Sequence, residues 1–311
     1  MSKKPCILIT GAAGALAQAV ITRLRHDYQI VACDSRHEVT LPEDIPSYCM
    51  DVQKRAFEDL FRQYQFTGVL HLGRLGANEI GRERRYNSNV IGTQKLLELC
   101  VKYHVPQIVI LSTYFVYGAH PLNPAYLTES APLKASGITM DLVDSVELEN
   151  LAMIYFWKHP EMQVTLLRPC NIVGPGVNNS ISQLLMKPRV PVLMGFSPMM
   201  QFIHLDDMAD AIALAYKKNK PGIYNVAPDD VVAYQKAVEL CGCRKQRIPS
   251  MPPALPIVLS RLLGWKQFPP YLMGYFRYQA TINGRHFQET FNFTPRYSLR
   301  DIFEHYALLK K

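Results

Sequence analysis

The sequence predicts an α/β protein with a Rossmann-type, doubly wound parallel sheet and a smaller C-terminal substrate lobe. Two features of the chain carry this prediction. Short apolar runs alternate with stretches of helical periodicity along the first half of the chain, and such alternation forces crossover connections and a parallel sheet. The first apolar run breaks into a glycine-rich turn and resumes as a helix, a pattern typical of dinucleotide-binding folds.

The glycine-rich turn lies within residues 7–17 (ILITGAAGALA). The run before it has the composition of a buried strand, and the apolar residues after it recur at helical spacing. Gly11 permits a tight turn, and Gly14 lets backbone N–H groups approach a pyrophosphate at the helix N-terminus, where unpaired donors and the helix dipole favour an anion. Ala17 stands where only a small residue lets the helix pack on the strand. The same glycine spacing also occurs in plain structural turns, so the residues that follow decide between the two interpretations.

A second apolar run, residues 28–34, ends in Asp34 about twenty residues after the glycine turn. A carboxylate at this point accepts hydrogen bonds from the ribose hydroxyls of NAD and repels the 2′-phosphate of NADP. NAD is therefore the expected cofactor. Arg36, which could pair with a 2′-phosphate, keeps NADP as the alternative.

Strand and helix continue to alternate downstream. A helical pattern opens at residues 49–52 and runs to residue 64, followed by a strand at 68–72, a helix at 89–100 and a strand at 107–111. We therefore predict an NAD-binding domain in residues 1–172, to which a strand and a helix return at about 201–227. Residues 173–311 are predicted to form mostly the substrate-binding lobe.

The composition narrows the range of partners. The 311-residue chain has a formal net charge of +8, which suggests an acidic partner, but no aromatic-basic pattern points to nucleic acid. Seven cysteines, mostly in apolar runs, suit reduced thiols in the cytoplasm, and Cys241-Gly-Cys243 lacks the second pair that a metal site needs. No apolar run is long enough to span a bilayer, and no signal peptide is expected before the first strand.

The basic residues are concentrated late in the chain. No acidic residue lies between Glu239 and Glu289, and residues 249–278 are rich in proline and aromatic side chains. The simpler interpretation of this stretch is the core of the lobe. The alternative is a basic, apolar surface at residues 244–285 that contacts a membrane lipid or a phosphate-bearing ligand.

Several motifs in a fixed order give the chain a resemblance to a known family. They are Gly11-x-x-Gly14-x-x-Ala17, Asp34, Asp51-Val52, His71-Leu72-Gly73, Asn89-Val-x-Gly-Thr93, Ser112-Thr113-x-x-Val116-Tyr117-Gly118, Thr128-Glu129-x-x-Pro132, Arg168-Pro-x-Asn171-x-x-Gly-Pro175, residues 202–210 and Gly222-Ile-Tyr-Asn225-Val. With these motifs the chain resembles the extended short-chain dehydrogenase/reductases, the NAD-dependent epimerase/dehydratase family. The resemblance implies an oxidoreductase or epimerase that acts on a nucleotide sugar, a sterol or another small molecule with a hydroxyl or carbonyl group.

The resemblance also assigns residues to the cofactor. They are Gly11, Ala13, Gly14, Ala15, Leu16, Asp34, Ser35, Arg36, Asp51, Val52, Leu72, Gly73, Arg74, Asn89, Ser112, Pro169 and Asn171. Asp51 and Val52 would face the adenine, and Pro169 and Asn171 would border the nicotinamide. Arg74 replaces the small residue usual in the family, which makes it either an additional phosphate clamp or a solvent-facing charge.

Thr113 matches the family's hydroxyl ligand for the substrate oxygen, because it lies four residues before Tyr117. A threonine that merely ends a strand is the alternative. Tyr114 and Phe115 occupy the positions where sugar dehydratases carry their acid pair, so the resemblance argues against a dehydratase. Tyr114 remains a second candidate proton donor.

The family's catalytic tyrosine and lysine, four residues apart, are missing. The matching positions hold Asp141 and Ser145, and no shift of the alignment restores the pair, because residues 127–154 contain no tyrosine and residues 135–157 no lysine. An unperturbed aspartate titrates near 3.9, so Asp141 would need burial to exchange protons near neutral pH, and Ser145 brings no cation. Asp141 is equally interpretable as an exposed residue that opens a helix.

Two functional hypotheses follow. The first is an NAD-dependent epimerase or oxidoreductase that uses a substitute for the missing pair, since the hydride chemistry belongs to the cofactor. The second is a protein that binds NAD and a ligand without turnover, as a sensor or assembly partner. The helices expected near residues 89–100 and 142–157 correspond to those that form a four-helix interface in related proteins, so a homodimer is expected.

Overall fold

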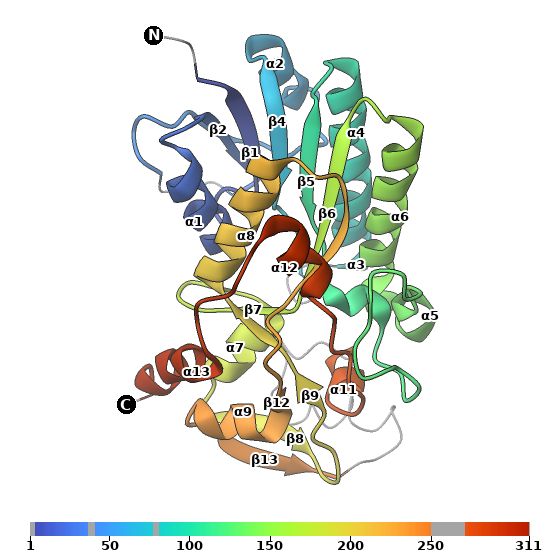
Figure 1. Cartoon of the computed structure of the whole chain (residues 1–311), viewed down its shortest axis with the longest axis vertical. Coiled ribbons are helices and arrows are strands. Elements are labelled where there is room, and N and C mark those ends of the chain that lie inside the picture. Colours follow the sequence, from blue (N-terminus) through green and yellow to red (C-terminus); the bar gives the residue numbers. More distant parts are fainter. Residues whose placement is uncertain (1–3, 37–40, 77–80, 250–270, 311) are drawn as a thin grey trace.

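The computed structural model describes residues 4–36, 41–76, 81–249 and 271–310 (Figure 1). Its centre is a seven-stranded sheet in the order β11-β6-β5-β4-β1-β2-β3, in which every neighbouring pair is parallel. The strands are β1 (Cys6–Thr10), β2 (Gln29–Asp34), β3 (Ser47–Cys49), β4 (Phe66–His71), β5 (Gln107–Leu111), β6 (Gln163–Pro169) and β11 (Gly222–Val226). The order of strands reverses between β1 and β4, which confirms the predicted doubly wound α/β fold.

Helices cover both faces of the sheet, and the alternation of side chains along each strand explains why. Ile7 and Ile9 of β1 pack into one cluster with α1 (Ala15–Leu24) and α8 (Leu205–Lys218). Leu8 packs into the other cluster. That second cluster is completed by α2 (Phe57–Gln63), α4 (Gly92–Lys102) and α6 (Val143–Lys158). Because successive residues of a strand point to opposite faces, one short apolar run contributes to both cores.

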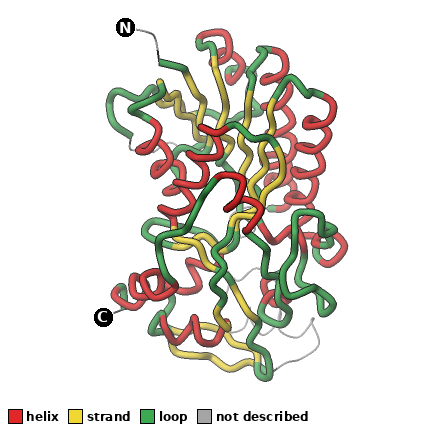
Figure 2. Tube along the Cα trace, viewed as in Figure 1, coloured by secondary structure: helices red, strands yellow, loops and turns green. Residues whose placement is uncertain are grey.

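The lower part of the molecule in Figure 2 is built from short elements. Three two-stranded sheets lie there: β7 (Asn171–Val173) with β10 (Phe202–His204), β8 (Arg189–Leu193) with β13 (Arg244–Ile248), and β9 (Met199–Met200) with β12 (Val232–Ala233). The accompanying helices are α7 (Ser180–Met186), α9 (Tyr234–Leu240), α11 (Leu272–Tyr275) and α13 (Leu299–Leu308). Helix α12 (Arg285–Phe291) instead packs on β11 and α8 of the main domain.

Some elements differ from the sequence expectation. The helical pattern from residue 49 becomes a helix only at Phe57, because Asp51 accepts a hydrogen bond from the backbone N–H of Gln53 and starts a turn. The strand Phe202–His204 pairs with β7 rather than with the main sheet, so β11 and α8 are the elements that return at 201–227. The helix expected at 89–100 begins earlier, with α3 (Arg82–Tyr86) and a π-helical turn (Asn87–Ile91).

Two further observations concern the chain as a whole. Within the described ranges, no helix combines the length and the apolar character needed to cross a membrane. None of the seven cysteines forms a disulfide, and every one except Cys49 is buried.

Candidate active site

The turn after β1 brings two backbone segments into contact. Gly11 has a φ of +74°, and a β-carbon on it would lie 2.3 Å from the Cα of Gly73 in the loop that follows β4. A β-carbon on Gly14, the N-cap of α1, would lie 3.2 Å from the carbonyl oxygen of Gly11. The two glycines therefore add no side chains of their own at the N-terminus of α1, which favours the approach of a pyrophosphate, and the Nη2 of Arg36 lies 3.8 Å from where a β-carbon on Gly14 would be. The predicted neighbours Ala13, Ala15 and Leu16 surround it at partly buried positions.

Asp34, at the end of β2, has hydrogen-bond partners on both of its carboxylate oxygens. Its two carboxylate oxygens accept hydrogen bonds from Arg36 (Nε at 3.0 Å and Nη2 at 3.0 Å) and from the backbone N–H of Ala13 at 2.9 Å. Burial opposes ionisation of Asp34, but these hydrogen bonds outweigh it and lower the pKa of the carboxyl group. In the sequence analysis Asp34 favoured NAD and Arg36 favoured NADP. In the structure the two side chains form one ion pair.

The other residues assigned to the cofactor gather at the same edge of the sheet. Leu72, Gly73 and Arg74 directly follow β4, Ser35 follows β2, and Asp51 and Val52 lie in the turn after β3. Pro169 is the last residue of β6. In an open α/β sheet, ligands bind at this carboxyl edge, where the strand order reverses.

Asn89 has a positioning role. Its side chain accepts a hydrogen bond from the backbone N–H of Leu75 at 2.9 Å and donates to the carbonyl of Leu75 at 3.0 Å. It also donates to the Asp144 carboxylate at 2.6 Å. The buried amide thus fixes the loop after β4 against the first turn of α6.

A cavity of about 230 Å³ opens beside the carboxyl ends of β5 and β6. Its walls come from the loop after β4, the turn after β5, the segment before α6 and residues 178–183 of the lobe, and Tyr271 completes them. Among the candidate catalytic residues, Thr113, Tyr114 and Asp141 line this cavity. Arg74, Ser112, Pro169 and Asn171 also line it, so cofactor and substrate residues share one space.

Asp141 and Ser145 do not lie on one helix. Asp141 belongs to a separate 3₁₀ turn (Met140–Leu142), whose start is fixed because Thr139 accepts a hydrogen bond from the backbone N–H of Asp141. The carboxylate forms an ion pair with Arg82 at 3.3 Å. Ser145, on α6, is only 1% exposed, and its hydroxyl accepts a hydrogen bond from the guanidinium of Arg74. Arg74 therefore points across the cavity toward α6 instead of projecting into solvent.

Thr113 and Ser112 follow β5 and have different surroundings. Thr113 caps the 3₁₀ turn Tyr114–Tyr117, and its Oγ1 lies 3.4 Å from the backbone N–H of Phe115. Ser112 is buried and donates to Glu149, which forms a buried ion pair with Arg168. The Nη1 of Arg168 in turn donates to the Tyr117 hydroxyl at 2.8 Å. This buried network supports the floor of the cavity, whereas Thr113 faces the space above it.

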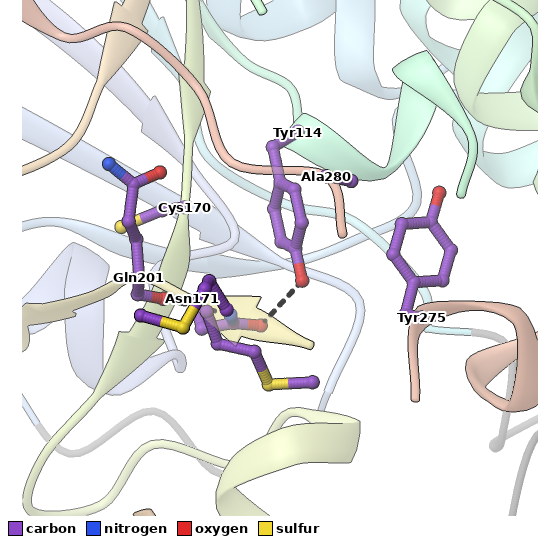
Figure 3. A pocket seen from close by; sticks show the side chains of 8 residues that line it. Tyr114, Cys170, Asn171, Gln201, Tyr275 and Ala280 are labelled. Carbon is purple, nitrogen blue, oxygen red and sulfur yellow. Dashed lines mark hydrogen bonds between the residues drawn. The ribbon is translucent and has the colours of Figure 1, made fainter. Parts of the chain in front are cut away.

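The hydroxyl of Tyr114 is committed to another residue. Figure 3 shows it pointing at Asn171, to which it donates a hydrogen bond of 3.0 Å. Burial raises the pKa of Tyr114 well above its usual value, although this hydrogen bond opposes the rise. The small pocket around the two side chains is also lined by Met199, Met200 and Gln201. The amide of Asn171 is fixed from the other side, because it donates to the carbonyl of Gln201 at 2.8 Å.

Sequence reasoning missed a buried ion pair in the cavity wall. Arg85 of α3 and Asp144 of α6 approach to 3.4 Å, and both side chains are less than 5% exposed. The Nε of Arg85 and the Oδ1 of Asp144 form no hydrogen bond. The two atoms are therefore partners in an ion pair but are too poorly aligned or too far apart for a hydrogen bond. Nothing local in the sequence identifies two residues 59 positions apart as a pair.

Tyr271 is a third residue of the cavity wall that the sequence analysis did not single out. It lies in the C-terminal lobe, directly before α11, and lines the same cavity as Arg74 and Thr113. The sequence offered only an aromatic-rich stretch from residue 268 to residue 278 as a signal. Half of the proposed lipid-contact segment, residues 250–270 of 244–285, lies outside the described residues. In the ranges that the structure covers, no group of three or more His, Cys, Asp or Glu side chains forms a metal site.

Comparison with known proteins agrees with this geometry. The sequence model of the NAD dependent epimerase/dehydratase family matches residues 7–227. An uncharacterized protein of Mycobacterium tuberculosis is 25% identical over 223 residues, which cover 70% of this chain and 58% of that protein. UDP-glucose 4-epimerase of Caenorhabditis elegans is 28% identical over 194 residues, 54% of each chain. The matched region thus spans little more than half of these relatives.

A solved structure extends the likeness to the whole chain. The dTDP-glucose 4,6-dehydratase of Bacillus anthracis, determined in complex with NAD, superposes with a TM-score of 0.76 and 18% identity. The match covers 98% of this chain and 96% of that one. At this identity the likeness establishes the fold, including the lobe, and leaves the chemistry to be argued from the site.

Proposed function

The chain belongs to the NAD-dependent epimerase/dehydratase family, and from this we propose that it oxidises or epimerises a hydroxyl-bearing carbon of a nucleotide sugar at a non-standard acid-base site. The observation that carries the proposal is the 230 Å³ cavity beside the carboxyl ends of β5 and β6, whose wall combines Thr113, Asp141 and two arginines, Arg74 and Arg85. Two relatives described above act on nucleotide sugars by name, UDP-glucose and dTDP-glucose. The arginines suit the phosphates of such substrates.

The residues present fit NAD. A β-carbon at Gly11 would collide with the backbone of Gly73, and the helix N-terminus at Gly14 suits a pyrophosphate. Asp34 stands at the end of β2, where ribose hydroxyls would reach it once Arg36 moves aside. The chemistry that NAD supplies when bound is reversible hydride transfer.

The chain's own residues would then orient the sugar and move a proton. Thr113 is proposed to donate a hydrogen bond to the reacting oxygen of the sugar, because its hydroxyl faces the cavity directly after β5. When the sugar is oxidised, the proton of its reacting hydroxyl group must pass to a side chain in the cavity wall. Asp141 and Tyr114 are the candidates that the sequence provides, but the first pairs with Arg82 and the second donates to Asn171.

Turnover of a sugar panel tests this proposal. Purified protein with NAD is incubated with UDP- and dTDP-sugars, alcohols and sterols, and reduced nicotinamide and epimeric products are measured. Thr113→Val should lower kcat by about 100-fold, the scale of one lost transition-state hydrogen bond. The matched control Thr128→Val removes an exposed hydroxyl bonded only to Ser130 and should leave kcat within about twofold. Tight NAD binding without turnover of any panel member would refute the proposal and favour a non-catalytic NAD sensor or assembly protein.

We further propose a homodimer formed through α4 and α6. The outer side of α6 exposes Trp157 (74%) and Ile154 (56%), and a groove of about 330 Å³ lies beside Trp157 and Ile223. Large exposed apolar side chains of this kind mark interfaces. Sedimentation at micromolar concentration should give a dimer, and Trp157→Glu should give a monomer. A monomeric wild-type protein would remove this proposal without affecting the proposed chemistry.

A further inference from the structure

The hydroxyl of Tyr271 forms weaker hydrogen bonds within the protein than the other ionisable groups in the cavity wall. Asp141 pairs with Arg82, Asp144 accepts from Asn89, and the hydroxyl of Tyr114 donates to Asn171. The hydroxyl of Tyr271, by contrast, lies 3.5 Å from the Oγ of Ser180, at the long limit of a hydrogen bond. Of the acidic and phenolic groups that line the described cavity, Tyr271 is therefore the one best able to exchange a proton with a ligand.

Packing fixes the ring of Tyr271 in the wall of the cavity, where its hydroxyl lies near Ser180, another lining residue. The ring meets Phe115 edge-on at a centroid distance of 5.4 Å, and Phe115 belongs to the turn that begins at Thr113. Tyr275, one helical turn further along α11, packs edge-on against both rings. Two segments more than 150 residues apart thus place the phenol and the Thr113 hydroxyl in the same wall.

A cation lies within electrostatic reach of this phenol. Burial raises the pKa of the Tyr271 hydroxyl, the charges of Arg74 and Arg85 oppose the rise, and the Asp141 carboxylate reinforces it. Arg85 is held by Asp144, whereas Arg74 is anchored by a neutral group, the hydroxyl of Ser145. A guanidinium bonded to a neutral hydroxyl keeps its full charge available to a neighbouring anion.

We propose that Tyr271 is the proton donor and acceptor of this site and that Arg74, positioned by Ser145, is the cation that stabilises its phenolate. The inference rests on the proposed function. When a sugar hydroxyl is oxidised, its O–H proton passes to the phenolate oxygen of Tyr271, and the hydride from the same carbon leaves for the bound cofactor. On reduction the phenol returns the proton to the carbonyl oxygen. The phenol belongs to the lobe and the cation to the Rossmann domain, so the pair exists only when the two are packed together.

The kinetic test compares two neighbouring phenols. Tyr271→Phe should lower kcat by about 100- to 10,000-fold and abolish the alkaline limb of the pH–rate profile, with the Kd of NAD within about threefold of wild type. The matched control Tyr275→Phe removes a hydroxyl that donates to the carbonyl of Phe115 at 2.6 Å, outside the cavity, and should change kcat by less than about fivefold. Full activity of Tyr271→Phe, with activity lost in Asp141→Asn, would assign the proton to Asp141 and overturn the inference.

A second measurement requires no turnover. With ¹³Cζ-labelled tyrosine in the full-length protein, the resonance that disappears in Tyr271→Phe reports the titration of this phenol. Arg74→Met should raise its pKa by about one unit or more, and Arg74→Lys should restore most of the wild-type value. An unchanged titration in Arg74→Met would refute the pairing, whatever the protein turns over. A shifted titration without turnover of any sugar would instead refute the proposed function and leave the Tyr271–Arg74 coupling established.

Discussion

The predicted nucleotide-binding edge of the sheet and the candidate active-site cavity are built in different ways. The edge uses backbone: Gly11 and Gly14 keep space open, and Asp34 follows on the next strand. The cavity uses charged and phenolic side chains from segments far apart in the chain, such as Arg74, Asp141 and Tyr271. The two glycines of the edge lie in one short turn, whereas the members of the cavity come from separate segments that the fold brings together.

The largest expected effect is at the edge. Gly11→Ala would place a β-carbon 2.3 Å from the Cα of Gly73 at a positive φ, so neither backbone can accommodate it. We expect a loss of about 4 kcal/mol in the free energy of unfolding, measured with urea, and NAD affinity reduced by about 100-fold or more. Gly76→Ala, in the same loop as Gly73 but with no atom within 4 Å of its β-carbon, is the control. Equal effects of the two substitutions would show that the close approach is unimportant.

The ion pair in the cavity wall gives the next effect. Asp144→Asn would leave the buried guanidinium of Arg85 without its anion, which should cost about 3 kcal/mol of stability. Asp141→Asn is the matched control, because its partner Arg82 is 67% exposed, and the cost there should be below about 1 kcal/mol. Similar losses of stability in the two variants would mean that burial does not make the Arg85–Asp144 pair more important than the Arg82–Asp141 pair.

Buried His71, at the end of β4, should make the stability of the folded protein depend on pH. His71 is buried between Thr10 (2.7 Å) and Thr93 (2.9 Å), and burial lowers its pKa to about 4. The unfolded chain takes up this proton below about pH 6.5 and the folded chain only near pH 4, so stability falls as the pH drops through that window, by roughly 3 kcal/mol in all. His71→Asn should flatten this part of the pH–stability curve, and His26→Asn, at an exposed position, should not. A curve of unchanged slope in His71→Asn would contradict the assignment.

The smallest effect concerns the cofactor. We predict that NAD binds more tightly than NADP, because the Asp34 carboxylate can accept from ribose hydroxyls but not face a phosphate dianion. Arg36→Ala would release both carboxylate oxygens from their pair and should increase this preference by about tenfold, equivalent to about 1.4 kcal/mol. Arg62→Ala, on the exposed side of α2, serves as the control. Calorimetric titration with both cofactors measures the ratio, and tighter NADP binding by the wild type would show that Arg36 governs the site.

Local sequence patterns alone predict the parallel sheet, the glycine turn and the position of Asp34. Each depends on neighbours within a few residues: alternating apolar residues define a buried strand, and a glycine allows a turn that no other residue tolerates. The absence of a tyrosine and a lysine near Asp141 and Ser145 could be read in the same way. The extra edge strand β3 and the late start of α2 could not, because both depend on hydrogen bonds to β2 and within a turn.

The surroundings of the candidate active-site cavity follow from tertiary contacts instead. That Arg74 turns to Ser145, that Arg85 meets Asp144, and that Tyr271 reaches the wall from the lobe are contacts between segments tens to hundreds of residues apart. These contacts form because the packing of the lobe and the helices brings the side chains together. No local sequence pattern predicts them. Local periodicity follows from the backbone's own geometry, whereas a polar cluster depends on which surfaces the whole fold brings together.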